Sequence, residues 1–196
     1  TGNAEQLWYS LQNGEVGSAA LNEWDLAFEM TGFNGSILVN TAKGLTVYET
    51  NAAITGWGAV NTLDTANWTM LENADTSWSA GALTHGNNLS DPNGFNLGWG
   101  DYNVSTHVVQ GSKIYAIGLA DGTSWLQLRI NSLSNGIYSF TYANLDGSNS
   151  QDATLNKADF TGKNFGYWSF TTNATQDREP LTSTWDLLFT KYIQIS

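Results

Sequence analysis

The two histidines of the chain are its best candidates for binding a transition metal. His85 lies in a Gly- and Asn-rich stretch, and His107 stands directly before two valines. Neutral imidazole is a good axial ligand of haem iron, so a pair on opposing loops could hold both faces of one haem. The alternative is that both are ordinary polar loop residues. Because of the two valines, we expect His107 to begin a strand that fixes its direction.

A second group of candidates offers oxygen ligands. Asp146, Asn149 and Asp152 lie close together in a polar stretch. Calcium takes about six to eight oxygens from carboxylates, amides and carbonyls, but this spacing lacks the alternating acids and final Glu of an EF-hand. The alternative is an Asp-Gly turn whose side chain bonds to nearby backbone N–H groups. The spacing favours the turn and leaves calcium as the second interpretation.

Two aspartates recur in one setting, since Asp25 and Asp186 each follow a tryptophan. Carboxylates held about 5–9.5 Å apart could cleave glycosides. A structural role explains the recurrence more simply, with each carboxylate bonded to adjacent backbone. The chain also has no cysteine and no Gly-x-Ser-x-Gly elbow, so no nucleophile–base pair is evident. We therefore predict a protein without enzymatic activity.

Tryptophan is unusually frequent, and some of these rings could stack on a sugar. Trp57 and Trp99 lie beside glycines in predicted loops, and Trp78 stands between two serines. These three are the candidates for a glycan platform. The alternative for each is packing beneath a loop.

The composition restricts the partners and the compartment. Lys and Arg number 7 against 18 Asp and Glu, which gives a net charge of −11. This excess of acid argues against nucleic acid and anionic membrane as partners. No apolar run reaches the roughly 18–20 residues that a membrane helix needs. Few charges, many Asn, Thr, Ser and Gly, and 9 tryptophans are typical of secreted β-proteins.

Strands must position these side chains, and the clearest strand pattern occurs twice. Residues 24–28 read Trp-Asp-Leu-Ala-Phe, and residues 185–189 read Trp-Asp-Leu-Leu-Phe. Trp, Leu and Phe alternate in both, which is the period of a strand with one buried face. A similar lead-in precedes each copy, at residues 7–11 and 166–170.

The repetition predicts two related units, at residues 7–33 and 166–192 of one all-β domain that spans residues 1–196. We expect Trp24 and Trp185 to be buried. The strand positions expected to face the core are Leu26, Phe28, Leu187 and Phe189.

A three-stranded meander is predicted over residues 113–143. Strands at about 113–119, 124–131 and 137–143 alternate around Asp121-Gly122 and Asn135-Gly136, and Asp-Gly and Asn-Gly are strong hairpin signals. Elsewhere the pattern predicts a short helical turn at residues 64–71 and mostly irregular chain at residues 79–103 and 144–164.

The two Trp-Asp strands with their lead-ins resemble the HmuY-like domain, known from haem-binding surface proteins of the Bacteroidetes. Residues 113–122, Lys-Ile-Tyr-Ala-Ile-Gly-Leu-Ala-Asp-Gly, resemble its middle hairpin. The resemblance extends in order from about Leu7 to Tyr192 and is nearest to large members that carry a type IX sorting tail. It implies a secreted or outer-membrane protein that binds haem, with His85 in a region comparable to the ligand loops.

The expectation is therefore an all-β binding domain without enzymatic activity. The resemblance implies haem as the ligand, and the alternative is a glycan- or protein-binding or structural module without haem. His107 matches a non-ligand aromatic position of the family, and neither methionine, Met30 or Met70, lies in the loop region to replace it. We therefore predict that the domain keeps the fold without high-affinity haem binding.

Overall fold

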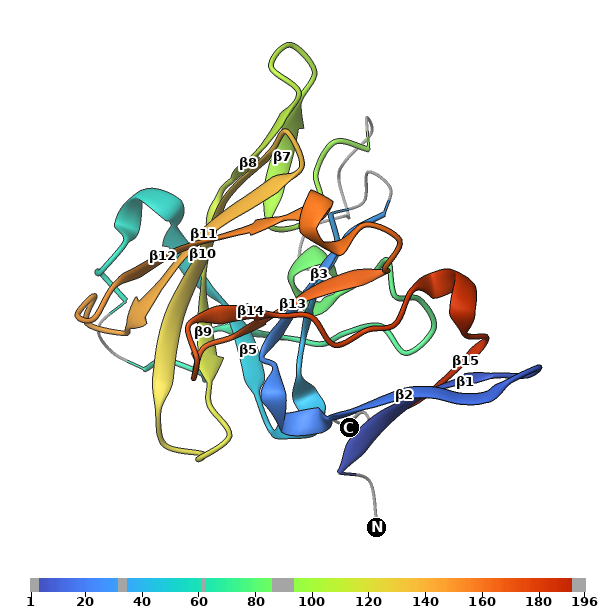
Figure 1. The fold of residues 1–196 in the computed structure, drawn as a ribbon. Coiled ribbons are helices and arrows are strands. Elements are labelled where there is room, and N and C mark those ends of the chain that lie inside the picture. The colour runs from blue at the N-terminus through green and yellow to red at the C-terminus, as the bar shows by residue number, and fades with distance from the viewer. Residues whose placement is uncertain (1–3, 32–34, 61–62, 86–93, 192–196) are drawn as a thin grey trace.

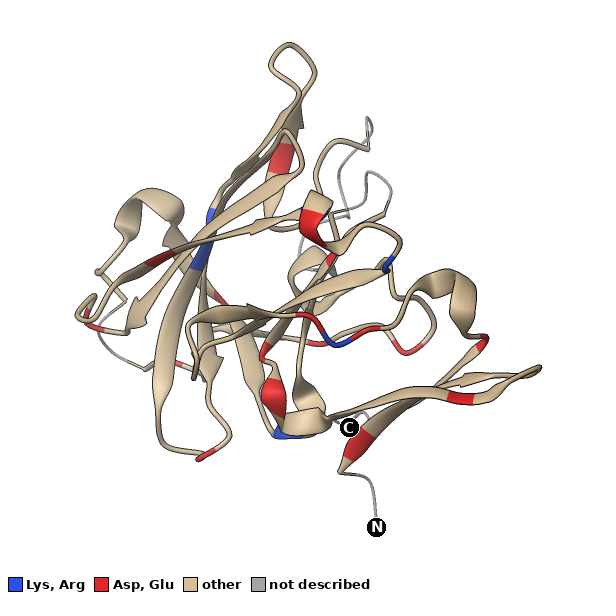
Figure 2. Cartoon of the chain, viewed as in Figure 1, with Lys and Arg blue, Asp and Glu red and all other residues tan. Residues whose placement is uncertain are grey.

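The computed structural model describes residues 4–31, 35–60, 63–85 and 94–191, and it confirms the all-β prediction (Figure 1). Residues 32, 33 and 192, which close the two predicted units, lie outside the described part. The strands form three antiparallel sheets. Charged side chains are sparse throughout, and acidic ones outnumber basic ones (Figure 2).

The largest sheet curls into a half-barrel, in the order β12-β11-β10-β9-β5-β6, with β8 pairing to β10 and β7 to β8. Its strands are β5 (Thr46–Ala53), β6 (Thr69–Leu71), β7 (Gly100–Asn103), β8 (Val108–Gly111), β9 (Lys113–Gly118), β10 (Trp125–Ser134), β11 (Ile137–Asn144) and β12 (Gln151–Asn156). The predicted meander is confirmed, because β9, β10 and β11 pair in order.

The two turns of the meander differ. Asn135 and Gly136 both have positive φ, 50° and 75°, as a two-residue type I′ turn requires. In the first connection only Gly122 has positive φ, and Asp121 instead accepts hydrogen bonds from the backbone N–H groups of Thr123 and Ser124. The hairpin predicted at Asp121-Gly122 is therefore confirmed, but its connection is not a type I′ turn. The bonds to the aspartate carboxylate stabilise a wider loop.

A four-stranded sheet packs across the half-barrel and completes the core. Its order is β14-β13-β3-β4, formed by β3 (Leu26–Glu29), β4 (Ile37–Val39), β13 (Phe165–Ser169) and β14 (Ala174–Gln176). Phe28 is fully buried, and its ring centroid lies 5.0 Å from those of Tyr138 and Phe140 on β11. The neighbouring contacts between the two sheets are also aromatic, Phe140 with Trp168 and Tyr142 with Phe170.

The third sheet has three strands in the order β15-β1-β2 and extends from the rest of the molecule (Figure 1). It consists of β1 (Glu5–Ser10), β2 (Gly14–Ala20) and β15 (Leu187–Phe189). Short helical segments connect the strands of the fold: η1 (Leu21–Glu23), η2 (Thr41–Lys43), η3 (Ile54–Gly56), α1 (Ala82–His85), η5 (Lys157–Phe160) and η6 (Thr182–Thr184).

The two repeat units exchange strands. The lead-in strand of the first unit, β1, pairs with the Trp-Asp strand of the second, β15. The lead-in strand of the second unit, β13, pairs with the Trp-Asp strand of the first, β3. Both exchanges use the same register: Leu7 with Phe189 corresponds to Gly166 with Phe28, and Tyr9 with Leu187 corresponds to Trp168 with Leu26.

The prediction that both Trp-Asp strands face the core is half right. Leu26 and Phe28 are fully buried, whereas Leu187 and Phe189 are 42% and 54% exposed. Trp24 is buried as expected, and Trp185 is only partly buried. The two strand pairs differ in position, because only the β3–β13 pair lies against the half-barrel. The β1–β15 pair presents the equivalent face to solvent.

Three expectations of irregular or helical chain are corrected. Residues 144–164 contain β12, which pairs with β11. Residues 64–71 contain β6, although a turn at residues 65–67 precedes it. Residues 79–103 contain α1 and β7, and residues 86–93 lie outside the described part. The elements in these segments are only three to six residues long, so a hydrophobic period extends over too few positions to be recognised.

The repeat supplies a matched pair of variants for the core. Phe28→Ala should lower the free energy of unfolding by about 3–5 kcal/mol, because it opens a cavity between two sheets. Phe189→Ala at the equivalent exposed position should change it by about 0.5 kcal/mol or less. Urea unfolding followed by tryptophan fluorescence at low protein concentration measures both. Equal losses would contradict the assignment of these two faces.

Candidate functional site

The structure describes the side chain of only one of the two candidate iron ligands. His107 lies on the exposed turn before β8 with φ of 56°, and its Nδ1 is 2.6 Å from the hydroxyl of Tyr102. It therefore precedes the strand, as expected, but contacts its own hairpin. His85 ends helix α1, which packs on β4 and β6, and its side chain lies outside the described part. The lack of high-affinity haem binding therefore stays a prediction.

The candidate calcium residues are engaged in separate local contacts. The Asp146 carboxylate accepts hydrogen bonds from the backbone N–H and the hydroxyl of Ser148, which lower its pKa. Asp152 instead accepts from the Thr141 hydroxyl on β11. Asn149 has a positive φ of 54° at the end of the turn. This geometry matches the Asp-Gly turn, and within the described residues no three His, Cys, Asp or Glu cluster as metal ligands would.

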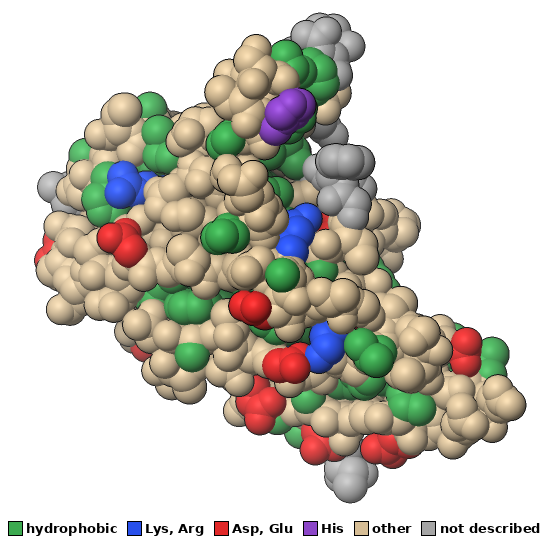
Figure 3. Space-filling model, turned by 45° about the horizontal axis from the view of Figure 1, so that its top comes forward, with side chains coloured by type: hydrophobic (Ala, Val, Ile, Leu, Met, Phe, Trp, Pro, Cys, Tyr) green, Lys and Arg blue, Asp and Glu red, His purple; other side chains and the backbone are tan. Residues whose placement is uncertain are grey.

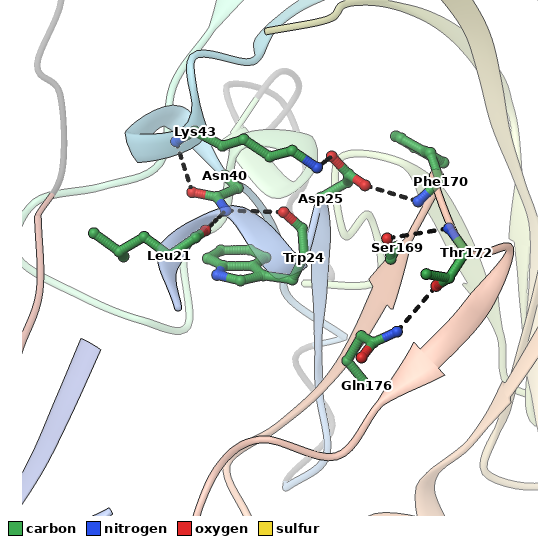
Figure 4. Close-up of polar contacts among 9 residues, drawn as sticks. All are labelled: Leu21, Trp24, Asp25, Asn40, Lys43, Ser169, Phe170, Thr172 and Gln176. Carbon is green, nitrogen blue, oxygen red and sulfur yellow. Dashed lines mark hydrogen bonds and ion pairs between the residues drawn. The ribbon is translucent and has the colours of Figure 1, made fainter. Parts of the chain in front are cut away.

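The repeated aspartates make the same backbone contacts, and Figure 4 shows the one between Asp25 and Phe170. Asp25 N–H donates to Trp168 O, and the Asp25 carboxylate accepts from Phe170 N–H at 2.7 Å. Asp186 repeats both contacts, with Tyr9 O and with Leu11 N–H at 2.7 Å. Each aspartate thus fixes the start of an exchanged strand pair, as the structural interpretation predicts.

The surroundings of the two aspartates differ. Asp25 is 2% exposed and forms an ion pair of 2.6 Å with Lys43, whereas Asp186 is exposed. Asn40 supports this corner, because its side-chain amide donates to Leu21 O and Trp24 O (Figure 4). The buried carboxylate is therefore compensated by a cation and has a backbone donor, as burial of a charge requires.

The three tryptophans proposed as a glycan platform are in different environments. Trp99 is fully buried and donates its indole N–H to Gly35 O, so its assignment to a surface platform is wrong. Trp57 is partly exposed, and the Arg129 guanidinium lies 4.6 Å above its ring. Trp78 is 49% exposed, and its ring lies 6.0 Å from Trp185 and 6.4 Å from Phe165. Of the three, only Trp78 adjoins other aromatic rings at a cleft.

That cleft lies between the three-stranded and four-stranded sheets and has a volume of about 340 Å³. We call it the aromatic cleft. Its aromatic walls are Trp8, Trp24, Trp78, Phe165, Tyr167 and Trp185, and its polar lining includes Gln6, Asn40, Asn73, Asp75, Asn164, Thr190 and Lys191. On the face shown in Figure 3, by comparison, hydrophobic side chains appear only as small separate areas among polar ones.

Equivalent residues of the two repeat units line the aromatic cleft together. Trp24 corresponds to Trp185, Trp8 to Tyr167, and Ala27 to Leu188, and all six line it. The four of these residues that lie on strands alternate with residues that point to the opposite faces of the same sheets, whereas Trp24 and Trp185 precede their strands. The aromatic cleft therefore follows from the repetition and from the exchange of strands.

Arg178 joins the two walls of the aromatic cleft. Its guanidinium donates to Gln6 Oε1 and to Ala20 O, both at 2.6 Å, and so holds β1 and the end of β2. It also lies 5.3 Å from the ring centroid of Tyr167 and 5.9 Å from that of Trp8. A cation that contacts aromatic rings of both sheets holds the two sheets at this distance from each other.

The neighbouring Glu179 is 3% exposed and lines the same cleft. Its carboxylate accepts hydrogen bonds from the backbone N–H groups of Asn164 and Phe165 and from the Tyr167 hydroxyl. Burial raises the pKa of Glu179 above its ordinary value, and these hydrogen bonds oppose the rise. Burial also raises the pKa of Tyr167, so its hydroxyl stays protonated at neutral pH.

Sequence reasoning assigned Trp24 and Trp185 to the core and did not single out Trp8, Arg178 or Glu179. One feature of the sequence does indicate the cleft. Aromatic residues recur at the equivalent positions Trp8 and Tyr167, each on the side of its lead-in strand that is opposite to the core. Arg178 and Glu179 lie in a linker without periodicity, and only the fold brings them beneath the sheets.

Comparisons with protein-family models, with curated proteins and with solved structures returned no match. Among the helices of the described residues, none has the length and hydrophobicity needed to span a bilayer.

The repeated aspartates provide a second matched pair. Asp25→Ala should cost about 3–5 kcal/mol of unfolding free energy, because it leaves Lys43 without its buried partner and Phe170 N–H without an acceptor. Asp186→Ala removes one exposed hydrogen bond and should cost at most about 1.5 kcal/mol. Urea unfolding curves measure the difference. A loss for Asp186→Ala as large as that for Asp25→Ala would contradict the role assigned to burial.

The raised pKa of Glu179 predicts a pH dependence of known sign. The folded state binds the proton more tightly than the unfolded state, so this contribution to stability is present at low pH and is lost as pH rises through the folded pKa. The stability of the wild type relative to Glu179→Gln should therefore be greater at pH ~4 than at pH ~7.5. Urea unfolding at both values measures it, with the exposed Asp159→Asn as the control for a lost charge. A difference that is constant or falls toward acid pH would refute the prediction.

Proposed function

We propose that this chain is a binding domain without enzymatic activity and that the aromatic cleft binds a glycan. The observation that carries the proposal is the position of Trp78 at the mouth of the cleft, half exposed, beside the rings of Trp185 and Phe165. A sugar presents an apolar C–H face that packs on such rings, and a ring of this kind loses little entropy when it is ordered.

The polar lining supports the same class of ligand. Hydroxyl groups both donate and accept hydrogen bonds, so they pair with amides and carboxylates alike. Asn164, Asp75 and Lys191 supply an amide, an exposed carboxylate and an exposed ammonium at one cleft. A volume of about 340 Å³ lies within the usual range of ligand pockets, and it suits one or two sugar rings of a longer chain.

Haem is the ligand that the HmuY-like resemblance implies, and the cleft favours a glycan over it. The described residues that line the cleft include no histidine, cysteine or methionine to ligate iron. The Tyr167 hydroxyl donates to Glu179. Secretion or attachment at the outer-membrane surface of a Bacteroidetes cell, by a type IX route, rests on the same resemblance and forms part of this proposal.

The test is binding of the whole chain to a panel of neutral and acidic oligosaccharides. We expect saturable binding of a subset of them, with quenching of tryptophan fluorescence. Trp78→Ala should weaken it about tenfold or more, as loss of a central aromatic contact does. Trp57→Ala, a partly exposed tryptophan outside the cleft, should bind as the wild type does. Binding that Trp78→Ala leaves unchanged would contradict the assignment of the site.

Haemin titration followed at the Soret band tests the competing ligand. We expect weak binding without saturation that is the same in His85→Ala and His107→Ala. A sharp one-to-one Soret shift that either substitution abolishes would overturn the proposal and establish haem as the ligand.

A further inference from the structure

The second Trp-Asp strand presents large apolar side chains to solvent. Tyr9, Leu11, Leu187 and Phe189 are 37%, 72%, 42% and 54% exposed, and together we call them the open face. They lie on the side of the β1–β15 pair opposite to Trp8 and Leu188, which line the aromatic cleft. The open face is therefore separate from the proposed glycan site and does not depend on it.

The repeat shows what kind of surface this face packs against. Its equivalents in the four-stranded sheet are Trp168, Phe170, Leu26 and Phe28, and three of these are buried. They contact the apolar face of another antiparallel sheet, through Tyr138, Phe140 and Tyr142 on β11. The same pattern of side chains on the same backbone register is thus suited to sheet-on-sheet packing.

The open face is also complementary to itself. Leu7 pairs with Phe189 at one end of the β1–β15 ladder, and Tyr9 pairs with Leu187 at the other. Each end thus presents one leucine and one aromatic ring, and the Tyr9 and Phe189 rings meet edge to face at 6.3 Å. Two such faces related by a two-fold axis place aromatic and aliphatic side chains opposite each other, which an isologous contact requires.

The response to salt distinguishes binding of a second copy from binding of a partner with the opposite charge. The acids on this side of the sheet are Glu5 and Glu15, both exposed, and Glu15 pairs with Tyr9 in the ladder. Both copies carry these acids, so charge opposes the association of like copies and salt should strengthen it. A partner with basic borders would instead bind more weakly as salt rises.

We infer that the open face binds the open face of a second copy of this chain. The aromatic face of β11 is already buried within each copy, so it is not available to a neighbour. The exposed apolar sheet face that a second copy presents is its own open face.

The experiment measures the mass of the whole chain in solution by sedimentation across a range of concentrations, at low salt and at about 0.5 M NaCl. We expect a monomer–dimer equilibrium that salt shifts toward dimer. Phe189→Asp should weaken the dimer about tenfold or more. Val104→Asp, which is equally exposed on the β7–β8 turn, should leave it unchanged. A monomer under all conditions, or a dimer indifferent to Phe189→Asp, would overturn the inference.

Cross-linking provides an independent measurement that does not need a disruptive substitution. The chain has no cysteine, so a single introduced thiol reports only on its own position. Tyr9→Cys and Phe189→Cys should each give a covalent dimer with a short bismaleimide at protein concentrations where Val104→Cys does not. Equal cross-linking of the three variants would reject the open face as the interface.

Discussion

The buried carboxylate of Asp25 is the contact on which the arrangement of the sheets depends. It accepts a hydrogen bond from the N–H of Phe170, directly after β13, and pairs with Lys43, so its charge is compensated and the strand register is set. The sheet that results has two apolar faces. One closes the core against the half-barrel, and the other forms a wall of the aromatic cleft, so an error of one residue in this register would exchange the two.

Local patterns in the sequence identified the meander and the two related strand units, because period-two alternation and turn residues act over a few positions. They also indicated the structural role of Asp25 and Asp186. They did not show which strands pair. From the sequence, β1 could pair with β3 of its own unit, and β15 with β13 of its own unit, as readily as with the strands observed. The exposure of Leu187 and Phe189 therefore could not be predicted.

The candidate site was less accessible to sequence reasoning for a related reason. Trp78 was identified from its serine neighbours, but its setting depends on Trp185, more than a hundred residues away. Trp99 has similar glycine neighbours to Trp57, and only the fold buries it beneath Gly35. Arg178 lies in a linker whose pattern gives no hint that both sheets converge on its guanidinium.

The exchange of strands also has a consequence for biosynthesis. Leu7 on β1 pairs with Phe189 on β15, so this ladder joins positions at opposite ends of the described chain. On the ribosome, β1 emerges long before β15 and remains without that neighbour until β15 has been translated. Contacts of such sequence separation are slow to form. The aromatic cleft, which β15 helps to line through Leu188, therefore cannot be complete until that strand has been translated.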